Sequence, residues 1–306
     1  MLESLLTKLS RIRIVGKSPV GSFLRGNEWI WIRLPSSIRN SRFITRYGTF
    51  LHTLALLAAS RRQYIGTFFL RNRPQLELIR RLGKHVAKGS VLRIAVLGCS
   101  NGAEVFSIMW AIRSAYPDVR VAMHAMDISK EVLECAQKGL YSLQAPGSVD
   151  NRIFERITSK EMEEMFDTED GHFKVKSWIR EGIMWHLGDA GDSNLPTILG
   201  LQDIVVANNF LCHMSPQDAQ KVARNVTRLV TPGGYLFISG IDLDIRAKLA
   251  IALGWKPILE LIEEVHDGDP VVRVDWPFSW WGLEPFTKRR TDWKVRYASA
   301  FTLGQI

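Results

Sequence analysis

The sequence predicts an α/β protein built on a mostly parallel sheet. Short apolar runs such as Leu92–Leu97 end at glycine or aspartate and indicate buried strands. A segment with helical periodicity follows each run, and strands that alternate with helices are joined by right-handed crossovers into a parallel sheet. Further strands are expected at 119–126, 183–187, 204–207 and 235–239, with a last strand at 295–303.

Capping residues mark the helices between these strands. Residues 103–116 have helical periodicity, and Ser129 precedes a helix with Glu131 in its first turn, where an acid stabilises the helix dipole. Ser215 begins another helix, with proline directly after it and Asp218 in the first turn. These signals support the alternation of strand and helix along the chain.

Composition excludes several classes of protein. Of the 306 residues, 46% are hydrophobic and 23% charged, as in an ordinary globular protein and unlike a disordered, collagen-like or disulfide-scaffold chain. The three cysteines form no CxxC pair, which predicts a reducing compartment and no structural zinc. No apolar run approaches the ~18 residues of a membrane span, and the N-terminus has no signal-peptide pattern. A cytoplasmic protein is therefore expected.

Charge is unevenly placed along the chain. Residues 1–90 hold seventeen Lys and Arg against three acids, whereas the remainder holds more acids than bases. Such asymmetry predicts an N-terminal segment that faces an anionic partner, such as the inner surface of a membrane to which the protein binds peripherally. A solvated, arginine-rich helical face is the alternative. Nucleic acid is a weaker candidate, because no base-stacking motif accompanies the charge.

These patterns predict a basic, mostly helical N-terminal segment at 1–90 and a larger domain at 91–306. Within the first segment, residues 16–41 are expected to be irregular. Residues 43–88 are expected to form two helices, the second of which begins near Pro74, because proline is tolerated in the first helical turn.

Two stretches of the larger domain depart from the regular alternation. Alternating polar and apolar residues within 149–180 predict a small antiparallel β insertion. The end of the chain, 240–306, holds five of the ten tryptophans. Such rings contact a sugar, pack as a lid on the sheet or form a dimer contact; the sequence leaves these alternatives and the oligomeric state open.

A ligand site is expected where the parallel strands end. The first strand ends in Leu97-Gly-Cys-Ser-Asn-Gly102, whose glycines let the backbone turn tightly and let a ligand approach. Asp127 follows at the end of the second strand, where a carboxylate can accept hydrogen bonds from both hydroxyls of a ribose. This combination suits NAD or S-adenosylmethionine, and the lack of GxGxxG spacing disfavours the dinucleotide.

Several motifs together resemble a known family. They are Gly98-Cys-Ser-Asn-Gly-Ala-Glu104, Asp127-Ile-Ser-Lys-Glu-Val-Leu-Glu-Cys-Ala136 and Asp203-Ile-Val-Val-Ala-Asn-Asn-Phe-Leu-Cys-His213. The chain resembles the S-adenosylmethionine methyltransferases of the chemotaxis receptor (CheR) type over about residues 68–239. The resemblance implies a Rossmann-like class I methyltransferase sheet, with S-adenosyl-L-methionine as cofactor and S-adenosyl-L-homocysteine as product.

The resemblance also implies roles for single residues. Glu104 would bind the methionine amino group of the cofactor, Asp127 its ribose and Asp189 its adenine amino group. Each acid also has a plainer interpretation, Glu104 as an acid in the first turn of a helix and the two aspartates as turn residues. The expected cofactor-binding residues are Gly98, Ser100, Gly102, Glu104, Asp127, Ile128, Asp189, Ala190, Asn208 and Asn209.

Two departures from the family bear on catalysis, and they make Arg71 and His213 the expected catalytic residues. The family has an arginine directly after a Phe-Phe pair, whereas here Phe68-Phe69 is followed by Leu70 and then Arg71. A guanidinium there would meet the cofactor or an acceptor carboxylate, or would lie on the surface. His213 stands where the family has tyrosine, and histidine can take the proton of a hydroxyl near neutral pH. The alternative for His213 is a packing or capping role.

A base beside the cofactor favours an acceptor that must lose a proton. The leading expectation is therefore methyl transfer to a hydroxyl of a sugar, glycolipid or other small metabolite. The alternative is methyl esterification of protein glutamate side chains, which needs no base because a carboxylate is already a nucleophile. A lesser alternative is a regulator that binds the cofactor without catalysis.

Overall fold

The structure is a computed structural model of the chain, and it describes residues 19–39, 41–59, 66–87, 91–142, 153–169, 171–269, 272 and 274–304. The chain divides into two compact units. The first comprises Met1–Arg62 and Asp269–Thr287, and the second comprises Gln63–Gly268 and Lys288–Ile306. The boundary is expected at residue 90, whereas the helix at 73–87 belongs to the second unit because it packs against the central sheet.

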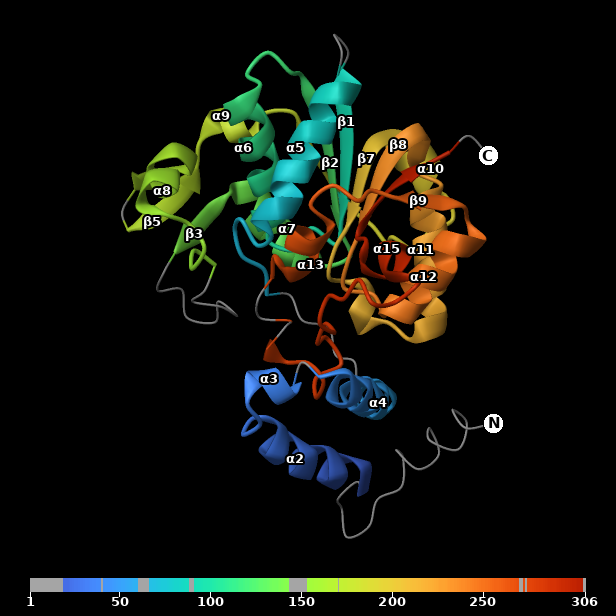
Figure 1. Cartoon of the computed structure of the whole chain (residues 1–306). Coiled ribbons are helices and arrows are strands. Elements are labelled where there is room, and N and C mark those ends of the chain that lie inside the picture. The colour runs from blue at the N-terminus through green and yellow to red at the C-terminus, as the bar shows by residue number, and fades with distance from the viewer. Residues whose placement is uncertain are drawn as a thin grey trace. The chain divides into compact units, whose positions relative to one another are not determined.

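The described residues of the first unit form helices before the returning segment 269–287 (Figure 1). Trp31, Leu51 and Trp276 are buried together in its small core, where the two indole rings meet edge to face with centroids 5.6 Å apart. The helices are α2 (Pro19–Trp31), α3 (Ser36–Arg39) and α4 (Arg42–Ala58).

The prediction of irregular structure over 16–41 is wrong for the larger part of that range. Helix α2 forms there, because burial of Trp31 against the rest of the unit stabilises a helix whose glycines disfavour it locally. Residues 16–18 and 40 lie outside the described residues.

A seven-stranded sheet forms the centre of the second unit, in the order β6-β2-β1-β7-β8-β10-β9. Neighbouring strands from β6 to β8 are parallel, and β10 is antiparallel to both of its neighbours. The predicted α/β fold with a Rossmann-like, mostly parallel sheet is therefore confirmed. The strands are β1 (Leu92–Leu97), β2 (Val121–Asp127), β6 (Ile183–Leu187), β7 (Gln202–Ala207), β8 (Val230–Ile238), β9 (Trp255–Pro257) and β10 (Ala300–Leu303).

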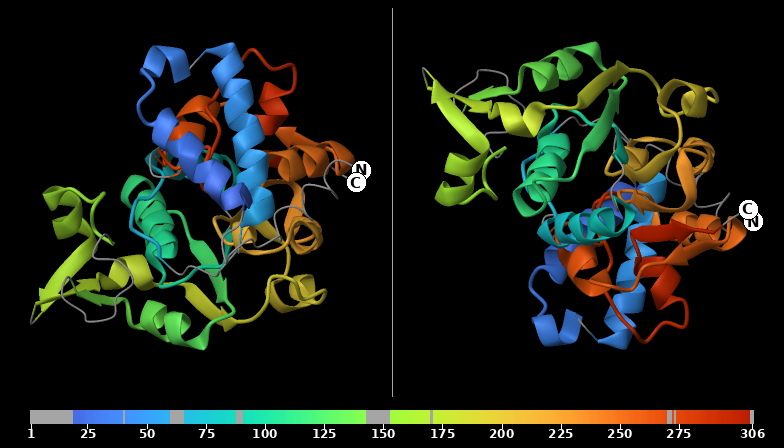
Figure 2. Two further views of the ribbon diagram at one scale, coloured as in Figure 1. Left: turned by 90° about the horizontal axis from the view of Figure 1, so that it is seen from below. Right: turned by 90° about the horizontal axis from the view of Figure 1, so that it is seen from above.

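Helices cover both faces of this sheet (Figure 2). The crossover β1–α6–β2 runs along the sheet in one direction and β7–α11–β8 in the other, so right-handed connections place α6 and α11 on opposite faces. The helices of this unit are α5 (Arg73–Ala87), α6 (Ala103–Ala115), α7 (Lys130–Lys138), α8 (Ser159–Met165), α9 (Ser177–Arg180), α10 (Leu195–Leu199), the 3₁₀ turn η1 (Leu211–His213), α11 (Pro216–Thr227), α12 (Leu243–Ala252), α13 (Ile262–Asp267) and α15 (Trp293–Tyr297).

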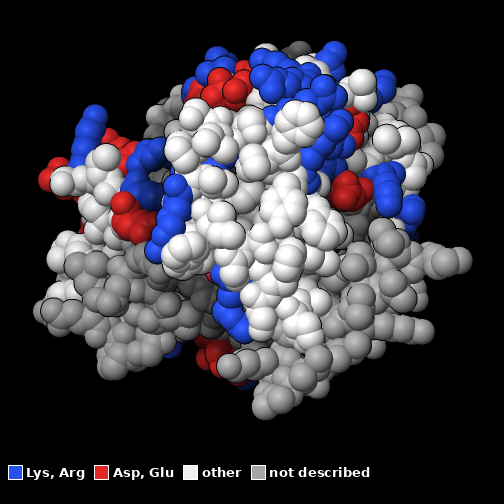
Figure 3. All heavy atoms as spheres, turned by 60° about the horizontal axis from the view of Figure 1, so that its bottom comes forward, with Lys and Arg blue, Asp and Glu red and all other residues white. Residues whose placement is uncertain are grey.

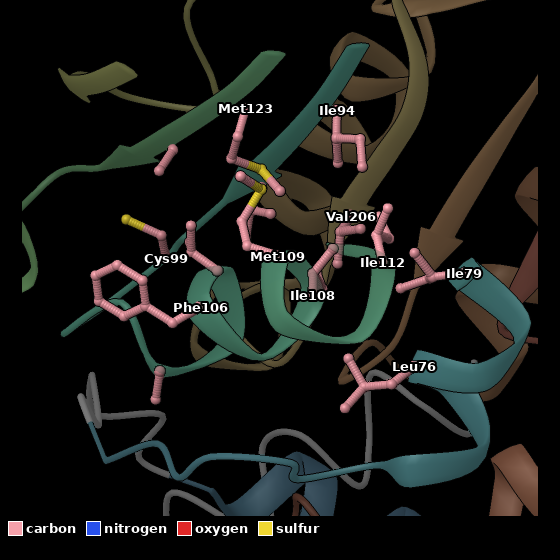
Figure 4. Close-up of a cluster of buried hydrophobic side chains, with 14 of the residues drawn as sticks. Leu76, Ile79, Ile94, Cys99, Phe106, Ile108, Met109, Ile112, Met123 and Val206 are labelled. Carbon is pink, nitrogen blue, oxygen red and sulfur yellow. The ribbon is translucent and has the colours of Figure 1, made fainter. Parts of the chain in front are cut away.

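The main hydrophobic core lies on the α6 face of the sheet. On α6, Ile108 points toward Val206 of the sheet and Ile112 toward Ile79 of α5, as Figure 4 shows. Burial of these aliphatic and aromatic groups is the main stabilisation that holds the helix, and the loop before it, on the sheet. The labelled members of this core are Leu76, Ile79, Ile94, Cys99, Phe106, Ile108, Met109, Ile112, Met123 and Val206.

A second, three-stranded antiparallel sheet follows α7 in the chain. Its order is β3-β5-β4, from β3 (Leu140–Ser142), β4 (Phe166–Glu169) and β5 (His172–Val175). The small antiparallel insertion expected within 149–180 is thus confirmed, although its first strand lies before that range. Residues 143–152 and 170 lie outside the described residues.

The last two core strands differ from expectation at their ends. Strand β8 begins at Val230 rather than at 235. Gln202 pairs with Val230 and Ile204 with Tyr235, so the Pro-Gly-Gly segment between these pairs forms a bulge within the strand. The last strand is shorter than 295–303: α15 occupies its first half, where Arg296 forms an ion pair with Asp244 of α12, and β10 begins at Ala300. None of the described helices is both long and apolar enough to cross a membrane.

Candidate functional site

The site lies where strands β1, β2, β7 and β8 end. The sheet order changes direction between β1 and β7, and open parallel sheets bind ligands in the crevice at such a point. The loop 98–102 follows β1, Asp127 ends β2, Asn208 and Asn209 follow β7, and Ser239 follows β8. The topology therefore brings four of the predicted segments to one edge of the sheet.

The loop after β1 has a backbone that only glycine adopts readily. Gly98 has a φ of +66° and Gly102 a φ of +88°. A Cβ at Gly98 would lie 2.8 Å from the ring of Phe210, so this loop lies directly against the segment after β7. Ser100 also has a positive φ, of +49°. The loop is thus a tight turn whose backbone groups remain close to the ligand edge.

Asp127 holds this loop in place. Its side chain is 7% exposed, and one carboxylate oxygen accepts the backbone N–H of Ser100 at 2.8 Å while the other accepts the N–H of Ser129 at 2.9 Å. Each oxygen keeps a further lone pair for a ligand hydroxyl. Ile128, the next residue, is exposed. Asp127 is therefore a turn residue and also a candidate acceptor for a ligand hydroxyl, so its two expected roles are compatible.

Glu104 is part of a network centred on the buried amide of Asn208. The amide nitrogen of Asn208 donates to Glu104 Oε1 and to Gln75 Oε1, both at 2.7 Å. The amide oxygen of Asn208 accepts the hydroxyl of Ser239 at 2.7 Å. The network fixes the orientation of the amide. It also joins α5, α6 and the ends of β7 and β8 at one point.

The carboxyl group of Glu104 lies in a weakly solvated place. Burial raises its pKa, and this effect outweighs the hydrogen bond from Asn208 and the charge of Arg71, which both lower it. Burial also raises the pKa of the Cys99 thiol, and the charges of Asp127 and Glu104 raise it further. The carboxylates of Asp127 and Glu104 therefore both act on the loop 98–102, Asp127 from the end of β2 and Glu104 from the start of α6.

This raised pKa predicts a pH-dependent affinity for a cationic ligand. The ionised form of Glu104 attracts an ammonium group, so affinity for S-adenosyl-L-homocysteine should fall as acidification protonates the carboxyl group. Calorimetric titration between pH 8 and pH 5 measures this dependence. In Glu104→Gln the affinity should be lower at pH 8 and should lose that pH dependence.

The stability of the free protein provides the matching control. A carboxyl group whose folded pKa is raised favours the fold at low pH and disfavours it as pH rises through the folded pKa. Glu104→Gln removes that penalty, so the ligand-free variant should melt at a higher temperature than the wild type at pH 8. A variant that is less stable and equally tight-binding would contradict the assignment of Glu104 as a ligand-binding acid.

Arg71 lies near this network, as its effect on the Glu104 pKa indicates. Leu70, the inserted residue before it, has a φ of +54° and is buried, and its N–H donates to Ser107 Oγ on α6 at 3.0 Å. The left-handed residue turns the chain after the Phe-Phe pair. The structure therefore brings Arg71 to the site despite the shifted register in the sequence.

Asp189 and Ala190 follow β6, the next strand beyond β2. Asp189 is exposed, and its carboxylate accepts the N–H of Gly191 at 2.7 Å, as in an Asx turn. Ala190 is buried, and its carbonyl accepts the amide N–H of Asn225 at 2.8 Å. Both residues lie at the same edge of the sheet as Asp127, because β6 and β2 are parallel neighbours.

His213 ends the 3₁₀ turn after β7 and is partly buried. Its backbone N–H donates to the carbonyl of Phe210 at 3.2 Å. Asn209, two residues before this turn, has a φ of +59° and lies against Gly240, so that the two segments after β7 and β8 touch. His213 is thus held in the loop beside Asn208, three residues beyond the ring that covers Gly98.

Gln75 and Ser239 also belong to the network around Asn208, and no sequence motif predicts them. Gln75 is buried in the first turn of α5, and its N–H donates to Asn72 Oδ1 at 3.1 Å. Gln75 and Ser239 contact Asn208 from segments far away in the chain, and neither stands in a motif. The one available signal for Gln75 is a polar side chain on the face of α5 that otherwise carries apolar residues.

These residues fit S-adenosylmethionine. Glu104 has one oxygen bonded to Asn208, and within the part of the chain that the structure describes its other oxygen receives no hydrogen bond. A poorly solvated carboxylate with a free oxygen suits the ammonium of the methionine moiety. Asp127 retains acceptor capacity for the ribose, and Gly98 and Gly102 allow the positive-φ backbone of the tight turn beside it.

Comparison with known proteins gives a family match. Residues 66–242 match the family model "CheR methyltransferase, SAM binding domain". A relative from Vibrio parahaemolyticus, named "Chemotaxis protein methyltransferase", is 29% identical over 49% of this chain and 54% of its own. A Pseudomonas putida relative, named "Probable biofilm formation methyltransferase WspC", is 26% identical over 58% of this chain and 40% of its own. The chain thus spans about half the length of these curated relatives, or less.

Among solved structures, the N-methyltransferase NodS of Bradyrhizobium japonicum in complex with S-adenosyl-L-homocysteine is similar. It has 14% sequence identity and a TM-score of 0.33, over 61% of this chain and 76% of its own. A Methanococcus maripaludis structure shares 13% identity and a TM-score of 0.30, over 77% of this chain and 78% of its own.

The comparisons correct the leading expectation for the acceptor. An acceptor hydroxyl on a sugar, glycolipid or small metabolite is wrong, because the relatives are named chemotaxis and biofilm formation methyltransferases rather than enzymes of glycan or metabolite modification. His213 in place of tyrosine is a single substitution, and the rest of the motif resembles the family. The family model confirms the resemblance and S-adenosylmethionine as cofactor. With more than half of its residues matched, this chain belongs to the CheR methyltransferase family.

Proposed function

We propose that this chain transfers a methyl group from S-adenosylmethionine to side-chain carboxylates of glutamate residues in a protein. The observation that carries the proposal is the family match over residues 66–242. Relatives named chemotaxis protein methyltransferases support it. The product is a methyl ester, and the acceptor is a protein rather than a free metabolite.

Each residue of the site has a role in this reaction. Glu104 holds the ammonium of the cofactor and Asp127 its ribose, which places the cofactor against the loop 98–102. Arg71 supplies a guanidinium for the acceptor carboxylate, since its charge already lowers the pKa of Glu104. Bound S-adenosylmethionine supplies an electrophilic methyl group. The chain itself has only to bind and orient, because an ionised carboxylate attacks without losing a proton.

Asn208 gives this orientation its rigidity. Its three hydrogen bonds to Glu104, Gln75 and Ser239 leave its amide with one arrangement, so Glu104 is fixed before a ligand arrives. Preorganised polar groups of this kind lower the cost of ordering the reactants.

Base-labile methylation tests the proposal. The purified chain is incubated with methyl-labelled S-adenosylmethionine and a protein extract of its organism of origin, and the Asp127→Ala variant serves as the control. Labelled proteins should release volatile methanol in alkali, and mass spectrometry should place the added methyl on glutamate. Label that survives alkali would contradict the ester. Absence of any labelled product would instead favour a cofactor-binding regulator without catalysis.

His213 gives a sharper prediction. A carboxylate acceptor needs no general base, so His213→Tyr, which installs the family residue, should lower turnover by less than about tenfold. Loss of a working general base costs ~10²–10⁴-fold. Turnover on the labelled protein acceptor is measured between pH 6 and pH 8, where the variant and the wild type should have parallel profiles. A rising limb in the wild type that the variant loses would return His213 to the role of base.

A further inference from the structure

Two helices of the first unit present large apolar side chains to solvent. Helix α2 exposes Phe23 and Ile30, and α4 exposes Phe43, Tyr47 and Phe50. Phe43 is 80% exposed, which is far more than a core residue tolerates. Within each helix these positions are three, four or seven residues apart and therefore share one face.

The two stripes lie side by side. The hydroxyl of Tyr47 donates to Asn27 Oδ1 at 2.6 Å, and Asn27 lies on α2 between Phe23 and Ile30 in helical spacing. The rings of Tyr47 and Phe50 are stacked, with centroids 6.2 Å apart. The five apolar side chains thus form one continuous surface, which we call the α2–α4 apolar face.

Arginines border this face. Residues 19–59 hold five arginines against one acid, Glu28. Arg42 and Arg46 lie on α4 next to the exposed rings, and the guanidinium of Arg33 lies 3.9 Å over the ring of Trp29, which is also exposed. Figure 3 looks at the molecule from the side of α2 and α4 and shows uncharged side chains with Lys and Arg beside them.

We propose that the α2–α4 apolar face binds the surface of an anionic membrane. Aromatic and aliphatic side chains flanked by basic residues insert into the boundary between headgroups and acyl chains, and guanidinium groups pair with lipid phosphates. A second copy of the chain fits the face poorly, because the two arginine borders would repel each other. The helices lie on the bilayer and do not cross it. The proposal is independent of the acceptor assigned to the methyltransferase site.

Vesicle co-sedimentation tests the proposal with the full chain. Wild-type protein should bind vesicles containing phosphatidylglycerol at least about tenfold more tightly than pure phosphatidylcholine vesicles, and the difference should shrink as salt screens the charges. The double variant Arg42→Gln and Arg46→Gln should weaken binding by about tenfold to thirtyfold, from about fivefold for each basic residue near the surface. Phe43→Ser should weaken it by about tenfold, and Phe43→Trp should keep it.

The second unit supplies matched controls. Ile251→Ser removes an apolar side chain that is 71% exposed on α12, and Lys221→Gln with Arg224→Gln removes two exposed charges from α11. Neither should change vesicle binding. Equal binding to the two vesicle types, or equal losses in the control variants, would overturn the proposal. Tight binding to polyglutamate without binding to vesicles would overturn it in favour of an acidic protein. Because methylation of proteins is assayed without lipid, failure here leaves the methyltransferase proposal unaffected.

Discussion

Asp127→Ala should lower the affinity for S-adenosyl-L-homocysteine by about tenfold to a hundredfold, which corresponds to the ~1.5–3 kcal/mol of a hydrogen bond to a charged group. The carboxylate is the ribose acceptor in this assignment and also receives the N–H groups of Ser100 and Ser129. Its removal therefore leaves two backbone donors without their partner and releases the loop 98–102. Stability should fall as well, by about 1–3 kcal/mol. Calorimetric titration and thermal unfolding measure the two effects separately.

Asp203→Ala separates loss of the site from loss of stability. Asp203 is also buried, and its carboxylate accepts the N–H of Arg93 at 2.9 Å and pairs with the guanidinium of the same residue. It lies near the start of β7, at the opposite end of the strand from Asn208. This variant should lose comparable stability and keep its affinity once folded. Equal affinity losses in both variants would mean that Asp127 acts only through the fold.

Among single glycine-to-alanine substitutions in the second unit, Gly240→Ala should lower the free energy of unfolding the most. Gly240 has a φ of +60°, and a Cβ there would lie 2.5 Å from the Cα of Asn209, which is backbone and cannot swing away. The clash pushes apart the segments that follow β7 and β8. We expect a loss of about 2–4 kcal/mol in the free energy of unfolding, from the left-handed backbone and the steric overlap together.

Gly139→Ala provides the comparison. Gly139 ends α7 with a φ of +59°, and its added Cβ would meet its nearest neighbours at an ordinary 3.5 Å. Only the backbone penalty applies there, about 1 kcal/mol. Chemical denaturation of both variants isolates the cost of the contact between Gly240 and Asn209. Because that contact also sets the position of Asn208, Gly240→Ala should weaken cofactor binding and Gly139→Ala should not.

Sequence patterns were sufficient for the parts of the site that lie within one motif. The glycines of the loop 98–102 and the acid at the end of β2 are local consequences of a strand that stops at the ligand edge. The parallel sheet followed from the alternation of strand and helix in the same way. The family resemblance supplied the cofactor, because the spacing of loop and acid alone also suits a dinucleotide.

Contacts between distant segments were beyond the same reasoning. Gln75 becomes part of the site only when α5 packs on α6 and meets Asn208. Arg71 reaches the site through the left-handed Leu70, a conformation that no propensity for leucine predicts. Helix α2 forms in a stretch of Gly, Pro and Ser because Trp31 has partners at Leu51 and Trp276. In each case tertiary contacts override a weak local preference.

The returning segment 269–287 has a consequence for the order of synthesis. Helices α2 and α4 emerge from the ribosome early, but Trp276, which completes their core with Trp31 and Leu51, is translated only after nearly all of the second unit. Domains commonly fold in the order in which they are made. Here the unit that begins first cannot complete its core until most of the second unit has been made. Its aromatic helices stay without Trp276 for most of translation, a period in which a nascent-chain chaperone has the most to shield.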